Sequence, residues 1–339
     1  MRRMNILLTF CINFLLFIPY YCTATINNGY FISLQTFENA IPEKTIYVSC
    51  NTPEGGDGSL EHPFKYIQQG VDAAIPGDTV YVFQGNYVYQ GIINKSINVF
   101  GENKYATVIY CYDQFEIFTI LSEHVHISGF TLINSGIFTL PKIRVLANSC
   151  IIDDMMMVPS SDTVSFSLGD ILLLHSNNSI LRDINFNPPP SWAQLGPAIR
   201  LEHSCSTTIE NNTMNLYISG LAIVNESNGN LISNNSFNSH CGIVQSKNNI
   251  LRRNSLFILI LNSSLATTIT DNNFSKFTLK ERFASGPQLQ FRDSEFNLDH
   301  NYWGRQRILP KIFFGIKTVN KITWPTIVID WNPAEEPLT

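Results

Sequence analysis

The amino-acid sequence predicts an all-β solenoid, namely a single-stranded right-handed parallel β-helix with a short N-terminal capping helix and a C-terminal cap. A short unit recurs through the middle of the chain: an apolar strand, an Asn/Ser/Asp turn and a single large apolar residue. Successive units are spaced by about 18 to about 30 residues, the range of solenoid repeats with insertions on some turns. Charged residues are only 14% of the 339, so Asn and Ser must cover much of the surface.

The composition narrows the class of protein. Apolar residues are 44% of the chain, enough to build a core. The formal net charge is −5, which argues against a general nucleic-acid binder with clustered Lys and Arg. We therefore expect no nucleic-acid partner.

Residues 1–24 are typical of an export signal. Arg2 and Arg3 are positive, 6–18 is mostly apolar, and small residues precede a cleavage site after about Ala24. The alternative is a membrane anchor, but the apolar run is shorter than the roughly 20 residues a spanning helix needs, and Asn13 interrupts it. No second run of that length follows, so we expect a secreted or cell-surface protein (periplasmic in a Gram-negative cell) without a membrane span after cleavage.

Residues 41–111 are expected to form the N-terminal cap and the first coils. Apolar residues at 45–48 indicate a strand. Within 64–74, apolar residues recur at three- and four-residue steps, which predicts a short amphipathic helix. Pro76-Gly77 ends that helix, and 79–83 is the next strand.

Residues 112–288 contain the repeat coils. The clearest copies of the unit are 179–186, 208–214, 231–237, 250–256 and 268–274. Asn tolerates the left-handed backbone that a tight corner needs, and Asn side chains on successive coils can hydrogen-bond as a ladder. A β-sandwich is the alternative, but it favours Asn-Gly hairpins at even spacing. The chain has only Asn28-Gly29 and Asn228-Gly229.

Residues 289–339 depart from the repeat. They contain Tyr302-Trp303, apolar strands near Ile312 and Ile327, and a Pro-rich ending. Because a solenoid must cover the open strand edge at each end, we expect the last coil and a C-terminal cap here.

Five cysteines follow the leader, at widely separated positions. An odd number cannot all pair within one chain, and there is no Cys-x-x-Cys. We expect thiols that fill core positions, with room for one disulfide. The five residues are Cys50, Cys111, Cys150, Cys205 and Cys241.

Two segments carry a resemblance to a known group. The run 57–64, Asp-Gly-Ser-Leu-Glu-His-Pro-Phe, continues through 76–82, Pro-Gly-Asp-Thr-Val-Tyr-Val, to 85–87, Gly-Asn-Tyr. It resembles the first segment of pectin-lyase-like right-handed parallel β-helix repeat proteins. The ending 301–304 with 330–333 resembles the tail of the NosD-like, surface β-helix branch. The matching residues form caps and coils, so the resemblance implies the fold more than an activity.

The polysaccharide lyases of that superfamily imply acidic residues around Ca²⁺ and a basic residue that removes a proton from a uronate. Aligning the coils on their corner apolar residue places Asp153, Asp183, Asn211, Asn234, Arg253 and Asp271 in one column, with Asp154 beside it. Asp153, Asp154 and Asp183 are therefore candidate metal ligands. Arg182, Arg200 and Arg253 are the candidate catalytic bases. The alternative is that the column holds Asn and Asp for backbone reasons alone.

The NosD resemblance raises copper as another candidate. His124 and His126 are two residues apart on an expected strand, so both side chains should share a face. Thioethers at 155–157 follow about one coil later, and thioether with imidazole suits copper. The favoured alternative makes Met156 a core residue.

Further candidates lie outside the corners. Trp192, in the Pro-rich insertion 187–192, is a candidate for stacking on a sugar ring. Seven Asn-x-Ser/Thr sequences are candidate glycosylation acceptors. They are Asn94, Asn177, Asn211, Asn225, Asn234, Asn262 and Asn273.

The sequence thus favours a non-catalytic module that binds carbohydrate or other cell-envelope components along an exposed sheet. A polysaccharide lyase or hydrolase, with Ca²⁺ if it is a lyase, is the second hypothesis. A NosD-like periplasmic copper-related accessory factor is the third.

Overall fold

The computed structural model describes residues 8–11, 21–27, 30–37, 43–111, 115–134, 138–159, 166–167, 169–187, 196–214, 219–274, 288–304, 310–319, 322–334 and 336–337. Backbone contacts divide the chain into two units, 1–44 and 45–339. In the first unit, β1 (Leu8–Cys11), β2 (Tyr21–Asn27) and β3 (Tyr30–Phe37) form an antiparallel sheet. The signal peptide at 1–24 stays a prediction.

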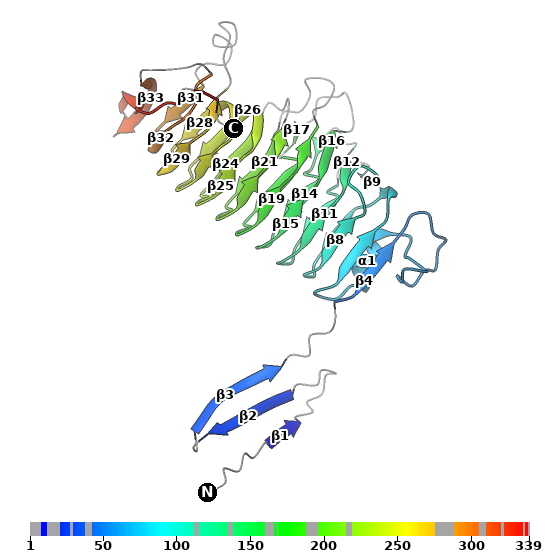
Figure 1. Ribbon diagram of the computed structural model, residues 1–339. Coiled ribbons are helices and arrows are strands. Elements are labelled where there is room, and N and C mark those ends of the chain that lie inside the picture. Colours follow the sequence, from blue (N-terminus) through cyan, green and yellow to red (C-terminus); the bar gives the residue numbers. More distant parts are fainter. Residues whose placement is uncertain are drawn as a thin grey trace. The chain divides into compact units, whose positions relative to one another are not determined.

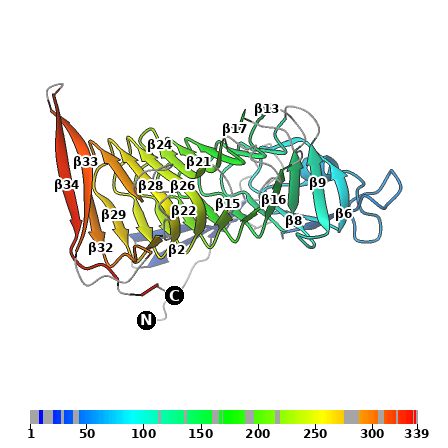
Figure 2. The same cartoon turned by 90° about the horizontal axis from the view of Figure 1, so that it is seen from above.

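The second unit is a right-handed parallel β-helix, as the sequence predicts (Figures 1 and 2). Each regular coil contributes strands to three stacks, which we call faces 1, 2 and 3. Face 1 is an 11-stranded sheet. Its strands are β4 (Thr45–Val48), β5 (Thr79–Val82), β8 (Asn98–Gly101), β11 (His126–Ser128), β15 (Ile151–Asp153), β19 (Ile180–Arg182), β22 (Thr208–Glu210), β25 (Leu231–Ser233), β27 (Ile250–Arg252), β29 (Thr267–Thr270) and β32 (Phe296–Asp299).

Faces 2 and 3 belong to one 18-stranded sheet, because β26 (Ser236–Val244) and β28 (Ser255–Asn262) pass through both. Face 2 also contains β6 (Gly85–Val88), β9 (Thr107–Cys111), β12 (Thr131–Asn134), β16 (Met156–Pro159), β20 (Asn185–Phe186), β23 (Thr213–Met214) and β30 (Asn273–Phe274). Face 3 also contains β7 (Gly91–Ile93), β10 (Phe118–Ile120), β14 (Ile143–Val145), β18 (Ile171–Leu174), β21 (Pro197–Glu202), β24 (Ser219–Val224), β31 (Leu289–Arg292) and β33 (Lys311–Val319). Between faces 2 and 3, the short strands β13 (Phe138–Thr139) and β17 (Phe166–Ser167) pair with each other.

The core runs along the solenoid as columns of equivalent residues. In each strand, alternate side chains point inward, and the register places each one against its equivalent in the next coil. On face 2, for example, the buried column contains Met157, Phe186, Met214, Phe237, Leu256 and Phe274. This register corrects the expectation for Met156, which is half-buried and points outward, whereas Met155 and Met157 are buried.

The corner between faces 1 and 2, which we call the first corner, turns on one residue with positive φ in each coil from β11 to β32. Asp154 (φ 48°), Asp183 (φ 56°), Asn211 (φ 57°) and Asn234 (φ 56°) occupy this position. Asp153 lies one residue earlier, on β15, and pairs in register with Arg182. The predicted alignment was therefore wrong by one residue in this coil, since Asp154 and not Asp153 belongs to the corner column.

Directly after the first corner, buried asparagines form the expected ladder. The Asn212, Asn235, Asn254 and Asn272 side-chain amides each donate to the Oδ1 of the next coil's asparagine, over 3.0–3.1 Å, and the ladder ends at Asn301. Each Oδ1 also accepts the backbone N–H of the preceding ladder residue. The coils from Asn212 to Asn301 are thus held to one another by paired hydrogen bonds shielded from water.

Both ends of the solenoid are capped. Helix α1 (Ile67–Ala73) buries Ile67, Gly70 and Val71 against the first strands of face 1. It is shorter than predicted, because Phe64 forms a bridge with Val48 instead of a helical turn.

At the other end, Trp303 stacks on Phe274 at 4.1 Å between ring centroids, and Phe313 of β33 packs on Trp303. β33 and β34 (Ile322–Asp330) form an antiparallel hairpin. Asp330 accepts a hydrogen bond from the buried Trp303 indole at 2.9 Å.

The cysteines occupy the positions expected for packing residues. Cys111, Cys150 and Cys241 are buried, while Cys50 and Cys205 are half-buried. Burial raises the pKa of the Cys150 thiol to about 11, so the thiol stays protonated at neutral pH. Within the described residues, no helix combines the length and the hydropathy that a membrane span requires.

We expect Asn254→Ala to lower the free energy of unfolding by about 3 kcal/mol, because it leaves the Asn235 backbone N–H buried without a partner and removes both ladder bonds of the Asn254 side chain. Urea denaturation followed by circular dichroism measures this change. Asn297→Ala, at an exposed position on β32, is the matched control and should change stability by less than about 0.5 kcal/mol. Equal effects of the two substitutions would contradict the role of the ladder.

Candidate functional site

The predicted acidic residues on face 1 form ion pairs. Asp153 is 7% exposed, and its Oδ1 lies 3.0 Å from His126 Nε2. Its Oδ2 accepts from Arg182 Nε at 3.1 Å and from Arg182 Nη2 at 2.9 Å. Burial by itself would raise the pKa of Asp153, but hydrogen bonds from His126, Ser128 and Arg182 outweigh it and lower the pKa to about 2. This carboxylate is held ionised and is far from the range of a general acid or base at neutral pH.

The first corner holds the other two predicted metal ligands. Asp154 pairs with Lys104 at 2.5 Å, and Asp183 is exposed. Both oxygens of Asp153 are already used, so the three carboxylates as arranged do not fit a Ca²⁺ site, and we derive no step through a cation. Within the described residues, no group of three or more His, Cys, Asp and Glu side chains is placed to hold a metal ion.

The candidate bases lie apart from one another. Arg182 is paired with Asp153 on face 1, and Arg253 occupies the exposed first corner. Arg200 points outward from β21 on face 3, where Glu202 binds its guanidinium at 3.0 Å. Their role as bases stays a prediction. Trp192 lies outside the described residues.

The copper hypothesis also rested on a shared strand face. β11 begins only at His126, and His124 precedes it in a left-handed turn with φ 59°. The two imidazoles therefore do not share a strand, and that expectation was wrong. The methionine thioethers proposed as further copper ligands do not lie together on the surface either, because Met155 and Met157 are in the core.

The candidate glycosylation positions fall into two sets. Asn94, Asn211, Asn234 and Asn262 are exposed. Asn177, Asn225 and Asn273 are half-buried, and the first two use their side chains in hydrogen bonds, to Cys205 N–H and to Glu202 respectively. Whether any of the seven is modified stays a prediction.

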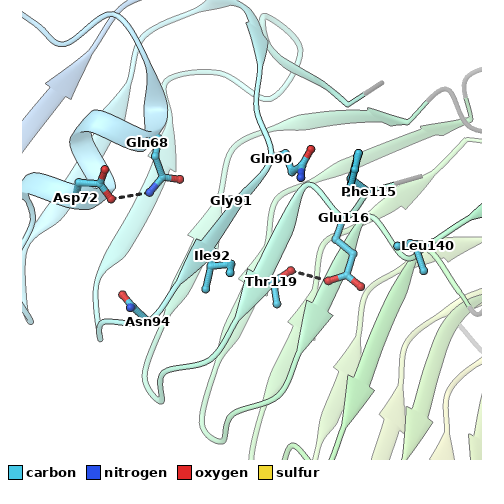
Figure 3. A pocket seen from close by; sticks show the side chains of 10 residues that line it. All are labelled: Gln68, Asp72, Gln90, Gly91, Ile92, Asn94, Phe115, Glu116, Thr119 and Leu140. Atoms are coloured by element: carbon cyan, nitrogen blue, oxygen red, sulfur yellow. Dashed lines mark hydrogen bonds between the residues drawn. The ribbon is translucent and has the colours of Figure 1, made fainter. Parts of the chain in front are cut away.

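Face 3 carries a pocket of about 570 Å³ over its first coils, which the sequence did not predict (Figure 3). β7 and β10 form its floor. Helix α1 forms one wall, and the segments that precede β10 and β14 form the other. The lining residues are Gln68, Asp72, Gln90, Gly91, Ile92, Asn94, Phe115, Glu116, Thr119 and Leu140.

Glu116 is fixed in this pocket by two partners. Its Oε1 lies 2.6 Å from Arg144 Nη2 on the neighbouring strand β14, and its Oε2 accepts from the Thr119 hydroxyl at 2.5 Å. Arg144 Nε is buried and has no hydrogen-bond partner within the described residues. Glu116 and Arg144 therefore form a rigid pair that neutralises its own charge.

The opposite wall presents amide and carboxylate groups. Gln68 donates to Asp72 at 2.7 Å along one turn of α1 (Figure 3). The ammonium group of Lys95 donates to the carbonyls of Val71, Asp72 and Ala74, at 2.7–3.1 Å, and so completes the C-terminal end of the helix. These bonds hold the helix wall against the strands.

Apolar surface completes the pocket. Phe115 is 49% exposed and Ile92 is 53% exposed. On the floor, Gly91 has no side chain, and a Cβ there would collide with the Tyr89 hydroxyl and with Gln68. An accessible aromatic ring beside oriented polar groups on strands is an arrangement suited to binding a small polar ligand such as a sugar.

Solved structures match this chain, although no family model and no curated protein does. The complex of XylC with xylose superposes with a TM-score of 0.51 at 9% identity, over 85% of this chain and 73% of that one. The enzymatically active domain of tailspike protein 2 of bacteriophage CBA120 gives 0.51 at 10% identity, over 94% of this chain and 51% of that one. A family 28 exopolygalacturonase of Yersinia enterocolitica gives 0.49 at 10% identity, over 90% and 74%.

The two likenesses with a TM-score of 0.51 show the class of fold. The chain has the right-handed parallel β-helix fold that the sequence resemblance implied, and the solved structures it matches are pectin-lyase-like β-helix proteins. It spans about half the length of the tailspike chain. At these identities the likeness extends to the fold alone, so the function has to be argued from the site.

The pKa of Asp153 makes stability depend on pH. Its folded pKa, about 2, is below the ordinary value of 3.8, so the unfolded chain binds more protons between these values. The ion pairs should contribute roughly 2 kcal/mol above pH 4, and this contribution should be lost as the pH falls towards 2. Urea denaturation across this range measures it.

Asp153→Asn should remove that part of the pH dependence. Asp183→Asn, at an exposed corner position, serves as the control and should keep it. The same acid-induced loss of stability in Asp153→Asn as in the parent would show that Asp153 is not the group responsible.

Proposed function

We propose that this chain is an exported β-helix module that binds a glycan in the face 3 pocket without cleaving it. The pocket carries the proposal, because it combines an exposed aromatic ring, apolar floor residues and oriented amide and carboxylate groups. Sugars offer the complementary surface, with apolar C–H faces and rings of hydroxyl groups. The export signal predicted at 1–24 also supports the proposal, because an exported protein encounters glycans of the cell surface and its surroundings.

The carboxylates support binding over catalysis. Glycoside hydrolysis uses two carboxyl groups, one of which must carry a proton at working pH. In the pocket, Glu116 is instead held by Arg144 and Thr119, and Asp72 accepts a hydrogen bond from Gln68; on face 1, Asp153 is held by His126 and Arg182. Each is committed to a structural pair. The structurally similar XylC was solved with xylose, a sugar, which is consistent with a glycan ligand on this fold.

Phe115→Ala should weaken glycan binding about tenfold, or about 1.4 kcal/mol, because the exposed ring would stack on a sugar face. A glycan array identifies a ligand, and isothermal titration calorimetry with that ligand measures the change. Tyr105→Ala is the matched control, since Tyr105 is 68% exposed and lies outside the pocket lining. If Phe115→Ala left the glycan affinity unchanged and Tyr105→Ala reduced it, the glycan site would lie outside the face 3 pocket.

The same preparation decides between binding and cleavage. Incubation with pectate, alginate and neutral polysaccharides, with and without Ca²⁺, should yield neither the ultraviolet-absorbing double bond of a lyase product nor new reducing ends. Product formation that is lost on substitution of Arg182, Arg200 or Arg253 would instead establish the lyase hypothesis.

A further inference from the structure

The charge of the pocket lining discriminates between kinds of glycan. Two lining residues are acidic, Asp72 and Glu116, and none of the described lining residues is Lys, Arg or His. Glu116 is neutralised by Arg144, whereas Asp72 shares one oxygen with the Gln68 amide and is exposed to solvent. The pocket therefore presents a negative charge to its ligand.

Two cations beside the pocket lining are held by other groups. Arg144 binds Glu116 through Nη2, and Lys95 bonds three carbonyls at the end of α1. A uronate carboxylate in this pocket would meet Asp72 and would have to displace one of these cations from its partners. Like charges brought together without a counter-ion repel each other.

The remaining polar groups suit hydroxyls. Gln68, Gln90 and Asn94 each offer both donors and an acceptor, and Thr119 adds a hydroxyl. Beneath the floor, the Tyr89 hydroxyl is buried and has no hydrogen-bond partner within the described residues. Burial, and then the Asp72 charge, raise the pKa of Tyr89, so its hydroxyl stays neutral beneath the floor and adds no charge to the pocket. Such groups pair with neutral oxygens as well as with charged ones.

We propose that the pocket selects a sugar unit that carries no acid group, either neutral or amino-substituted, and that Asp72 accepts hydrogen bonds from its hydroxyls or amine. This inference rests on the proposed glycan binding and adds the class of glycan. It predicts a preference for sugars without acid groups, whereas a lyase would prefer acidic polymers.

Binding is tested by calorimetry on the full chain with four probes. The uncharged probe is xylohexaose, the amino-sugar probe is chitosan hexamer, and the acidic probes are oligogalacturonate and oligoalginate. We expect at least one of the first two to bind, at least tenfold more tightly than either acidic oligomer. Asp72→Asn should weaken that binding about tenfold, because a charged acceptor is replaced by a neutral one. Glu61→Gln removes the same charge from an exposed residue outside the pocket lining and should leave affinity unchanged.

Each other outcome is decisive. Preferential binding of an acidic oligomer would overturn this inference and leave glycan binding in place. The inference would also be overturned if the Asp72→Asn protein, with unchanged thermal unfolding, bound the uncharged or amino-sugar probe as tightly as the parent protein does. Failure of all four probes, and of every glycan on the array, would overturn the proposed function itself.

Discussion

The buried asparagine ladder, from Asn212 to Asn301, is the interaction on which the later coils of the second unit depend. Each ladder amide lies directly after a residue in the left-handed conformation, so it satisfies backbone groups that the sharp corner would otherwise leave unpaired inside the protein. The ladder also spans successive coils at 3.0–3.1 Å. It therefore fixes the register between neighbouring strands. Register decides which side chains form the core columns and which form the outer faces.

The pocket lies in the earlier coils, before the ladder begins, and follows from the register of their parallel strands and from the N-terminal cap. Outward positions of β7, β10 and β14 bring Ile92, Thr119 and Arg144 into neighbouring positions along face 3. Helix α1 closes the first coil and supplies Gln68 and Asp72 as a wall (Figure 3). One segment thus protects the open end of the solenoid and completes the pocket.

Much of the fold was predictable from the sequence, because alternating Ile, Leu and Val indicate short strands, Asn indicates the corners between them, and this pattern repeats from coil to coil. The error at Asp153 has a local cause. Its coil has Met155 where later coils have a ladder asparagine such as Asn212, and two Asp residues stand side by side. Without the asparagine as a marker, alignment on Met156 instead of Met157 shifted the coil by one residue.

The pocket was not predictable in the same way, since its residues come from coils and a helix spread over positions 68–140, with no motif linking them. The sequence carried one signal, namely Phe115 next to Glu116 just before a strand. That signal could not be used, because only the structure shows that the Phe115 ring is exposed. The predicted sites depended on acidic and basic residues in a column. The corner column is real, but Asp153 lies outside it and is held by His126 and Arg182 on face 1, while Asp154 in the column pairs with Lys104.

The most direct test of this account is hydrogen–deuterium exchange with and without a glycan ligand found by array screening. The account predicts that ligand slows exchange in 67–73 and 90–94, the helix wall and the floor strand, and leaves 151–154 and 180–183 unchanged. Protection at 151–154 and 180–183 without any at 67–73 would contradict it and move the site to face 1 and the first corner.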